Sequence, residues 1–241
     1  MYKRQGQQAA QRQANHDYQQ LEQLPQEPNL LVGEEPPASG SLDLPQFTLP
    51  AGAALALVGG DVNSSSALLN SITALEGDLP HNASYAGRPL ESYQRSLLRR
   101  RLRLLVPDPQ LSSGTLLENL THFRPDQLGP QAAQLCEQWG VSPWIQALPL
   151  GYETPIGENQ DFPLSRSLRF RLQVIAALLD QPAVLLLDTS QVDLPAAELQ
   201  WFLGIECEPS KLVALEMWPP GLPPSIPTLQ WKASELVEVQ P

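Results

Sequence analysis

Four short runs of the chain are almost wholly apolar, which is typical of strands buried on both faces of a parallel sheet. These runs are Ala53–Val58, Leu102–Val106, Ala183–Leu187 and Leu212–Leu215. Another segment, Leu42–Leu49, alternates apolar and polar positions and contains Pro45, so it predicts one strand at a sheet edge. His81–Leu90 contains Gly and Pro and predicts a hairpin loop.

Helical spacing of apolar residues links these predicted strands. We expect helices over Ala67–Leu75, Glu91–Arg101 and Ser165–Leu179, and a helical region from Thr115 to about Ala147. Strands that alternate with helices predict an α/β fold with a mostly parallel sheet. Residues from about 115 to 179 contain helical patterns only, which predicts a helical insertion.

The first part of the chain has a different composition. Residues 1–28 are rich in Gln and Ala and predict a polar helix, which Pro25 and Pro28 end. Residues 29–41 mix Gly, Pro, Ser and acidic residues as linkers do. The main domain is therefore expected over 42–241, and residues 1–28 are interpreted either as a free tail or as the end of a missing transmembrane domain.

Charge and composition narrow the classes of function. The formal net charge is −11, whereas a nucleic-acid groove needs a basic surface, so we expect no nucleic-acid partner. The five arginines of Arg95–Arg103 form the single basic cluster, which is either a solvated helix face or a contact for an acidic partner. No run approaches the roughly 18–20 apolar residues of a membrane span, so we expect the chain itself to be soluble.

A Gly- and Ser-rich turn joins the strand Ala53–Val58 to the helix after it. Backbone N–H groups at such a turn, together with a helix N-terminus, form a cradle for phosphate. The spacing fits the motif Gly, four free positions, Gly-Lys-Ser/Thr, with Ser65 at the lysine position. The residues predicted to surround a phosphate are Gly59, Gly60, Asn63, Ser64, Ser65, Ser66 and Ala67.

Asp188 directly follows the apolar run Ala183–Leu187. An acid at this place is predicted to act together with the phosphate cradle. In nucleotide hydrolases with such a cradle, an acid at a strand end and the cradle's Ser or Thr hydroxyl hold Mg²⁺. Ser66 and Asp188 are thus the candidate Mg²⁺ ligands. A strand-end Asp that only caps a turn is the alternative.

Several segments in a fixed order resemble the ATPase domains of exporter-type ABC transporters, type I secretion ATPases among them. The resemblance covers about residues 42–217. It implies a P-loop ATPase core with a helical subdomain. Besides the cradle and Asp188, it is carried by Val106-Pro-Asp-Pro109, Gly114–Asn119, Leu148–Glu158 and the signature-like Leu164, Ser165, Arg166, Ser167 and Leu168.

The chain departs from that family where chemistry is expected. Ser65 lacks the charge of the family's lysine, and Thr189 replaces the glutamate that activates water. Asp108 replaces the glutamine of the metal-sensing loop, for which Gln110 is a substitute if the loop is shifted, and Met217 replaces a histidine. In the signature, Arg166 would crowd the approach of a phosphate. The aromatic residue that stacks on adenine is missing from 29–41.

The resemblance with its departures implies a degenerate nucleotide-binding domain of an exporter with no catalytic residue intact. ATP and Mg²⁺ are then expected to bind weakly or not at all. The implied partners are a transmembrane domain, fused or separate, and a second ABC-type ATPase domain, at the cytoplasmic face of the inner or plasma membrane. The alternatives are a soluble interaction module that binds through Arg95–Arg103, and an ATPase active only as a composite site with an intact partner.

Overall fold

The computed structural model describes residues 36–59, 62–73, 79–157, 164–219, 226–232 and 235–239. The chain divides into two units, Met1–Val32 and Gly33–Pro241, and all described residues belong to the second. The helix predicted over 1–28 lies outside the described residues, as do residues 29–35 of the predicted linker.

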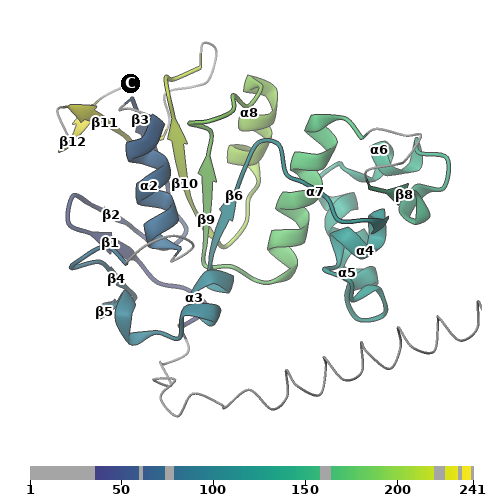
Figure 1. Cartoon of the computed structure of the whole chain (residues 1–241), viewed down its shortest axis with the longest axis horizontal. Coiled ribbons are helices and arrows are strands. Elements are labelled where there is room, and N and C mark those ends of the chain that lie inside the picture. Colours follow the sequence, from purple (N-terminus) through teal and green to yellow (C-terminus); the bar gives the residue numbers. More distant parts are fainter. Residues whose placement is uncertain are drawn as a thin grey trace, which may run out of the picture. The chain divides into compact units, whose positions relative to one another are not determined.

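A six-stranded sheet forms the centre of the domain (Figure 1). Five of its strands are parallel, and the last strand of the chain pairs antiparallel at one edge. In spatial order the strands are β12 (Glu235–Val239), β11 (Thr228–Lys232), β3 (Ala54–Val58), β10 (Ser210–Leu215), β9 (Val184–Asp188) and β6 (Leu102–Leu105). The four apolar runs are therefore confirmed as neighbouring strands, because only a strand covered on both faces needs apolar residues throughout.

A smaller antiparallel sheet packs beside the first. Its strands are β2 (Phe47–Leu49), β1 (Leu42–Leu44), β4 (Ser84–Tyr85) and β5 (Arg88–Pro89). The prediction of one strand over Leu42–Leu49 was wrong, since the chain turns at Pro45 and Gln46 and Leu44 pairs with Phe47. The step of three between Leu44 and Phe47 breaks the period of two, and Pro45 suits a turn.

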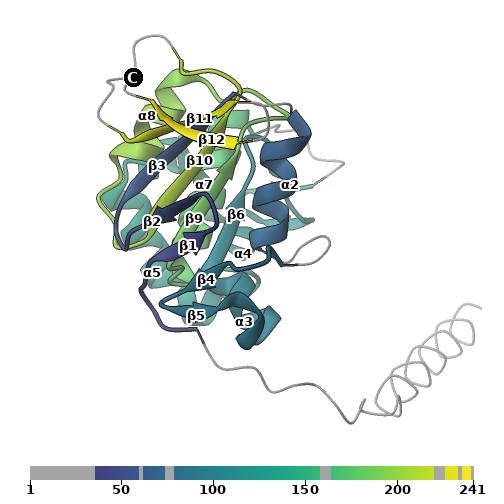
Figure 2. The ribbon, with the colours of Figure 1, turned by 90° about the vertical axis from the view of Figure 1, so that its left-hand side faces the viewer.

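Helices cover both faces of the large sheet, as Figure 2 shows from the side. Helix α2 (Val62–Ile72) and the small sheet cover one face, where Leu55 and Leu57 of β3 are buried. Helices α7 (Arg166–Leu179) and α8 (Ala196–Gly204) cover the other face. Successive residues of each strand thus face different layers.

Two predicted helix starts differ from the structure. Helix α2 begins at Val62, five positions before the predicted Ala67, so the three serines after Asn63 belong to its first turns. Helix α3 (Arg95–Arg101) begins after a short 3-10 turn, η1 (Leu90–Ser92). Within the described residues, no helix has the length and apolar character that crossing a bilayer requires.

The helical insertion has its own buried core between α7 and three further helices. These are α4 (Leu116–Leu120), α5 (Pro125–Gln138) and α6 (Ser142–Gln146), followed by the 3-10 turn η2 (Gly151–Glu153). The expectation of helices alone was wrong, because β7 (Gly114–Thr115) and β8 (Pro155–Ile156) pair antiparallel at its base. Thr115 also begins α4 with a reciprocal capping box to Glu118.

Candidate functional site

The predicted phosphate turn lies at the edge of the large sheet where parallel strands end. Ala214 of β10 pairs with Leu57 of β3 and with Asp188 of β9, so the ends of these strands meet. Gly59 follows β3 with φ of 78° and donates its N–H to Leu215 and Glu216 carbonyls, 3.1 Å from each. A positive φ favours glycine, which agrees with Gly59 as the first residue of the motif.

A cluster of two hydroxyls and one carboxylate occupies this edge. The Ser66 hydroxyl donates to Asp188 Oδ2 at 2.6 Å, and Ser66 Oγ lies 2.7 Å from Ser190 Oγ. Ser190 donates both its N–H, at 3.0 Å, and its hydroxyl to Asp188 Oδ1. Asp188 is 9% exposed, and hydroxyl groups satisfy both of its oxygens. We call Ser66, Asp188 and Ser190 the hydroxyl–carboxylate cluster.

The structure places Ser66 beside Asp188, the pair predicted to hold Mg²⁺, and adds Ser190, which the sequence analysis did not predict. Binding of Mg²⁺ by this pair stays a prediction. The available signal for Ser190 was a hydroxyl residue two positions after the strand-end acid, which can bond back to that acid's side chain or backbone. Gly60 lies outside the described residues, and the side chains of Asn63 and Ser64 are also not described. Their predicted contact with phosphate stays a prediction.

Ser65 stands at the lysine position and is only 2% exposed. Ala67, by contrast, is exposed. A buried hydroxyl carries no formal charge, so Ser65 cannot neutralise a phosphate as an ammonium group does.

Thr189, at the place of the water-activating glutamate, faces the interior. Its N–H and its hydroxyl both donate to the Ala214 carbonyl, at 3.1 and 2.8 Å. The side chain is 5% exposed, so it contributes to the packing of β9 against β10. A hydroxyl that is held in this way has neither the basicity nor the position of a general base.

Asp108, at the place of the metal-sensing glutamine, pairs with Arg169 of α7. The Arg169 guanidinium donates from Nε at 3.2 Å and also from Nη2 to the same carboxylate oxygen. Its third nitrogen, Nη1, donates to the Leu164 carbonyl at 2.6 Å. Asp108 thus ties the loop after β6 to the beginning of the signature-like helix, a contact that the sequence did not predict.

The signature-like residues surround the start of α7. Ser165 caps the helix by accepting the Leu168 N–H at 3.2 Å, which is the usual role of Ser before a helix. Arg166 donates Nη2 to the Asp193 carbonyl, whereas its Nε is buried without a partner. Leu168 is 4% exposed in the insertion core and Ser167 is half-buried. Arg166 therefore reaches toward the loop after β9.

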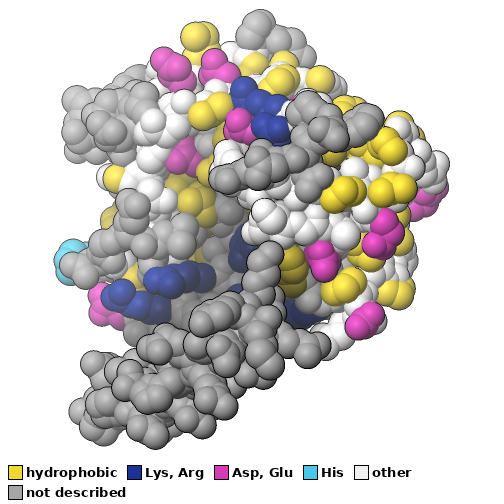
Figure 3. Space-filling view, turned by 45° about the vertical axis from the view of Figure 1, so that its right-hand side comes forward, with side chains coloured by type: hydrophobic (Ala, Val, Ile, Leu, Met, Phe, Trp, Pro, Cys, Tyr) yellow, Lys and Arg dark blue, Asp and Glu magenta, His cyan; other side chains and the backbone are white. Residues whose placement is uncertain are grey.

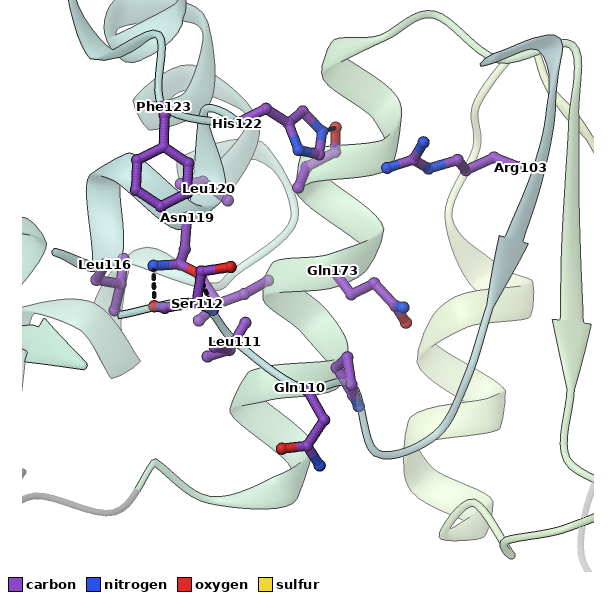
Figure 4. A pocket seen from close by; sticks show the side chains of 13 residues that line it. Arg103, Gln110, Leu111, Ser112, Leu116, Asn119, Leu120, His122, Phe123 and Gln173 are labelled. Carbon is purple, nitrogen blue, oxygen red and sulfur yellow. Dashed lines mark hydrogen bonds between the residues drawn. The ribbon is translucent and has the colours of Figure 1, made fainter. Parts of the chain in front are cut away.

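Two further residues predicted at the site, Met217 and Gln110, lie outside the hydrogen bonds of the hydroxyl–carboxylate cluster. Met217 follows β10 and is 69% exposed. Gln110 lies at a cavity of about 300 Å³ between β6, the loop after it, α4 and α7 (Figure 4). Asn119 donates to the Ser112 carbonyl at 2.9 Å and fixes the loop on one side of this cavity.

The comparisons with known proteins agree with this geometry. A sequence profile described as ABC transporter matches residues 42–191. The chain is 35% identical over 152 residues to the glutathione/L-cysteine transport system ATP-binding/permease protein CydD of Escherichia coli, covering 62% of this chain and 25% of that protein. It is 31% identical over 149 residues to a multidrug efflux ATP-binding/permease protein of Mycobacterium bovis, covering 61% and 12%.

The chain spans about a quarter or less of these relatives. A similar match, 28% identical over 149 residues, is the uncharacterized ABC transporter ATP-binding protein YknV of Bacillus subtilis, with 61% of this chain and 24% of that protein covered. Strands β3, β6 and β9, the turn at Gly59 and the Ser66–Asp188 contact lie within the matched region. This chain belongs to the ABC transporter family and forms an ATPase domain of that family.

Proposed function

We propose that this chain is a degenerate nucleotide-binding domain that couples and supports an exporter and hydrolyses ATP weakly or not at all. The observation that carries the proposal is the hydroxyl–carboxylate cluster beside an inward-facing Thr189. Hydrolysis needs a base that accepts a proton from the attacking water, and Thr189 offers none. The fold that positions such a base is nevertheless retained.

The loss of positive charge supports the same proposal. Charge-assisted hydrogen bonds to phosphate are about twice as strong as neutral ones, and Ser65 replaces the side chain that would make them. A buried serine at this position leaves nucleotide binding to backbone N–H groups. We therefore expect weak binding.

The donor set of the cluster fits a hard divalent cation, because hydroxyl and carboxylate oxygens are the ligands that Mg²⁺ prefers. Ser66 and Asp188 would hold the ion. Bound Mg²⁺ would supply charge neutralisation of phosphate oxygens. Ser190 occupies Asp188 Oδ1, so its hydroxyl has to turn away before that oxygen can serve a cation.

We further propose a transmembrane domain and a second ATPase domain as partners, at the cytoplasmic face of a membrane. Support comes from relatives named ATP-binding/permease proteins, of which this chain matches a part. The predicted helix over 1–28, interpreted as the end of a transmembrane domain, points the same way. A type I secretion role remains one form of this proposal.

The cavity beside the loop after β6 suits a contact with the transmembrane partner. Leu116, Leu120 and Leu172 give it an apolar lining, and Phe123 beside them is 52% exposed. Because Asp108 and Arg169 join this loop to α7, a segment that presses on the loop also acts on the helix.

A hydrolysis assay on the purified chain tests the proposal. We expect release of phosphate from Mg²⁺-ATP at background level, unchanged by Asp188→Asn. The double variant Ser65→Lys/Thr189→Glu restores two of the replaced family residues, and an active ABC ATPase measured in the same way is the positive control for the assay. Turnover by the natural chain near the roughly 1 per second that is ordinary for enzymes, abolished by Asp188→Asn, would show the proposal to be wrong.

A further inference from the structure

The arginines of helix α3 form a basic surface on a strongly acidic chain. Arg95, Arg99 and Arg100 are exposed and Arg101 is half-buried; we call these four the arginine surface. No acidic residue occurs between Ser92 and Pro107, although the chain as a whole has a net charge of −11. Figure 3 shows dark-blue side chains gathered across the lower part of the molecule, the level at which Figure 1 places α3.

Asp180, a carboxylate beside this surface, is already paired. Asp180 binds His122 Nε2 at 3.2 Å through Oδ2 and Arg124 Nη2 at 3.1 Å through Oδ1. Both of its oxygens are thus engaged on the side of the helical insertion. Arg101 meanwhile donates to the Gln181 carbonyl, a neutral group, at 2.8 Å. The positive charge of the arginine surface is therefore not cancelled by Asp180.

A small notch lies within this surface. Arg100 and Arg101 line a hollow of about 100 Å³ together with Leu97, Asp180 and Gln181. That volume is close to the size of a single phosphate group and is too small for a helix or a bulky side chain. The Asp180 carboxylate that lines the hollow is paired with Arg124, so two arginines of the surface face one carboxylate that already has a cationic partner. Arginine guanidinium groups match phosphate oxygens in geometry as well as charge.

The arginine surface lies at the end of the domain where the described chain begins. The Tyr85 hydroxyl donates to the Pro37 carbonyl at 3.0 Å, and the Tyr93 hydroxyl donates to the Tyr85 carbonyl at 2.8 Å. Burial raises the pKa of Tyr85 to about 12, and the positive charge of Arg101 opposes this shift. Pro37 thus lies beside β4, and β4 and α3 share one end of the domain, as Figure 2 also shows.

We propose that the arginine surface binds the phosphate headgroups of anionic phospholipids. The inference rests on the proposed function, because that function places the chain beside a transmembrane domain. The net negative charge of the chain does not prevent such binding, since screening limits charge effects to about 10 Å at 0.1 M salt. Each basic residue at an anionic membrane surface strengthens binding about fivefold.

The test uses the full chain and vesicles in a flotation assay. One set of vesicles contains phosphatidylcholine alone, and the other contains about one third phosphatidylglycerol. We expect at least about tenfold more binding to the anionic vesicles at about 0.1 M salt, and loss of this preference at about 0.5 M. Equal binding to both, or a preference that survives high salt, overturns the proposal.

Two charge-changing variants test whether binding to anionic vesicles depends on α3. Arg95→Gln/Arg99→Gln/Arg100→Gln is expected to lower binding to the anionic vesicles at least tenfold. Gln191→Glu/Gln200→Glu/Gln230→Glu changes the net charge equally at exposed positions away from α3 and is expected to change binding less than about threefold. Equal effects of the two variants overturn the assignment to α3.

Two further measurements distinguish failure of the lipid proposal from failure of the proposed function. Retention on immobilised polyglutamate without vesicle binding would assign the surface to an acidic protein and overturn the lipid proposal. Phosphate release measured on the same preparations tests the proposed function independently. Vesicle binding by a chain that hydrolyses ATP would refute that function and keep the lipid surface, whereas an inactive chain without vesicle preference refutes only the lipid surface.

Discussion

At the scale of residues, the proposed degenerate site has neutral hydroxyl groups at positions where the family resemblance implies charged side chains. Ser66 and Asp188 meet as the family resemblance implies, whereas Ser65 and Thr189 face inward as neutral hydroxyl groups. Ser190 adds a third hydroxyl to the same carboxylate. Hydroxyl and N–H groups of the chain therefore satisfy both oxygens of Asp188.

A positive charge placed at position 65 should increase the affinity of the chain for nucleotide. We expect Ser65→Lys to tighten binding of a fluorescent ATP analogue about tenfold with Mg²⁺ present, because a charged hydrogen bond contributes about 1.5–3 kcal/mol. Ser65→Met is the control, with similar length and no charge. Thermal melting checks that both variants are folded. Equal affinities of the two folded variants would contradict the importance of positive charge at position 65.

The Arg171–Glu198 pair is a second residue-scale feature. Arg171 donates from Nε and Nη2 to Glu198 at 2.8 and 3.1 Å, and the pair is largely buried. The guanidinium also stacks 4.7 Å from the Trp144 ring centroid and 4.8 Å from that of Trp201. It therefore joins α6 of the insertion to α8 of the sheet layer.

Removing this guanidinium leaves the Glu198 carboxylate buried without its partner. We expect Arg171→Met to lower the free energy of unfolding by about 3 kcal/mol in urea titrations. Arg100→Met, on the exposed face of α3, should change the free energy by less than about 0.5 kcal/mol. A loss of similar size in both variants would argue against a special role for the buried pair.

At the scale of elements, α7 connects the large sheet with the helical insertion. One side of it packs on the sheet beside α8, and the other forms the insertion core. At its start, Arg169 holds Asp108 of the loop after β6. Movements of the loop and the helix are coupled through this ion pair.

Loosening the ion pair should increase the mobility of the loop more than it affects global stability. Asp108→Asn removes a partly exposed charge pair worth about 0.5–1 kcal/mol. We expect amide hydrogen exchange over Pro107–Ser112 to quicken about threefold, with β9 unchanged. Gln110→Ala, an exposed change in the same loop, is the control. Unaltered exchange in Asp108→Asn would mean that the loop is held by other contacts.

At the scale of the whole molecule, stability depends on contacts between the sheet layer and the insertion. Asp180 follows α7 and binds His122 and Arg124 from the α4–α5 connection. The His122 hydrogen bond lowers the pKa of Asp180 to about 2, although burial opposes this. The charges of His122 and Arg103 and the hydrogen bond from Arg124 lower it further. The ionised carboxylate is therefore favoured in the folded state.

This shift predicts a dependence of stability on pH. Because the folded pKa lies below the unfolded value of 3.8, the contribution of Asp180 is complete above about pH 4 and is lost as the pH falls toward 2. We expect a contribution of about 2 kcal/mol. Urea unfolding between pH 5 and pH 2.5 measures it, and Asp180→Asn should flatten the curve in that range. Parallel curves for both proteins would contradict the prediction.

The sequence by itself determined the central strands, most helices and the phosphate turn, because periodicity and a glycine turn are local properties. The meeting of Ser66 with Asp188 followed from the family order of motifs. The sequence did not determine the division of Leu42–Leu49 into two strands or the β7–β8 pair, which depend on neighbouring segments.

Only the tertiary structure decided which groups satisfy the site. Ser66 and Ser190 are 124 positions apart, and Arg169 lies 61 positions from Asp108. Such contacts depend on how strands and helices pack, and no local pattern encodes that. A buried carboxylate must find partners, and packing placed hydroxyl groups rather than a basic side chain beside Asp188.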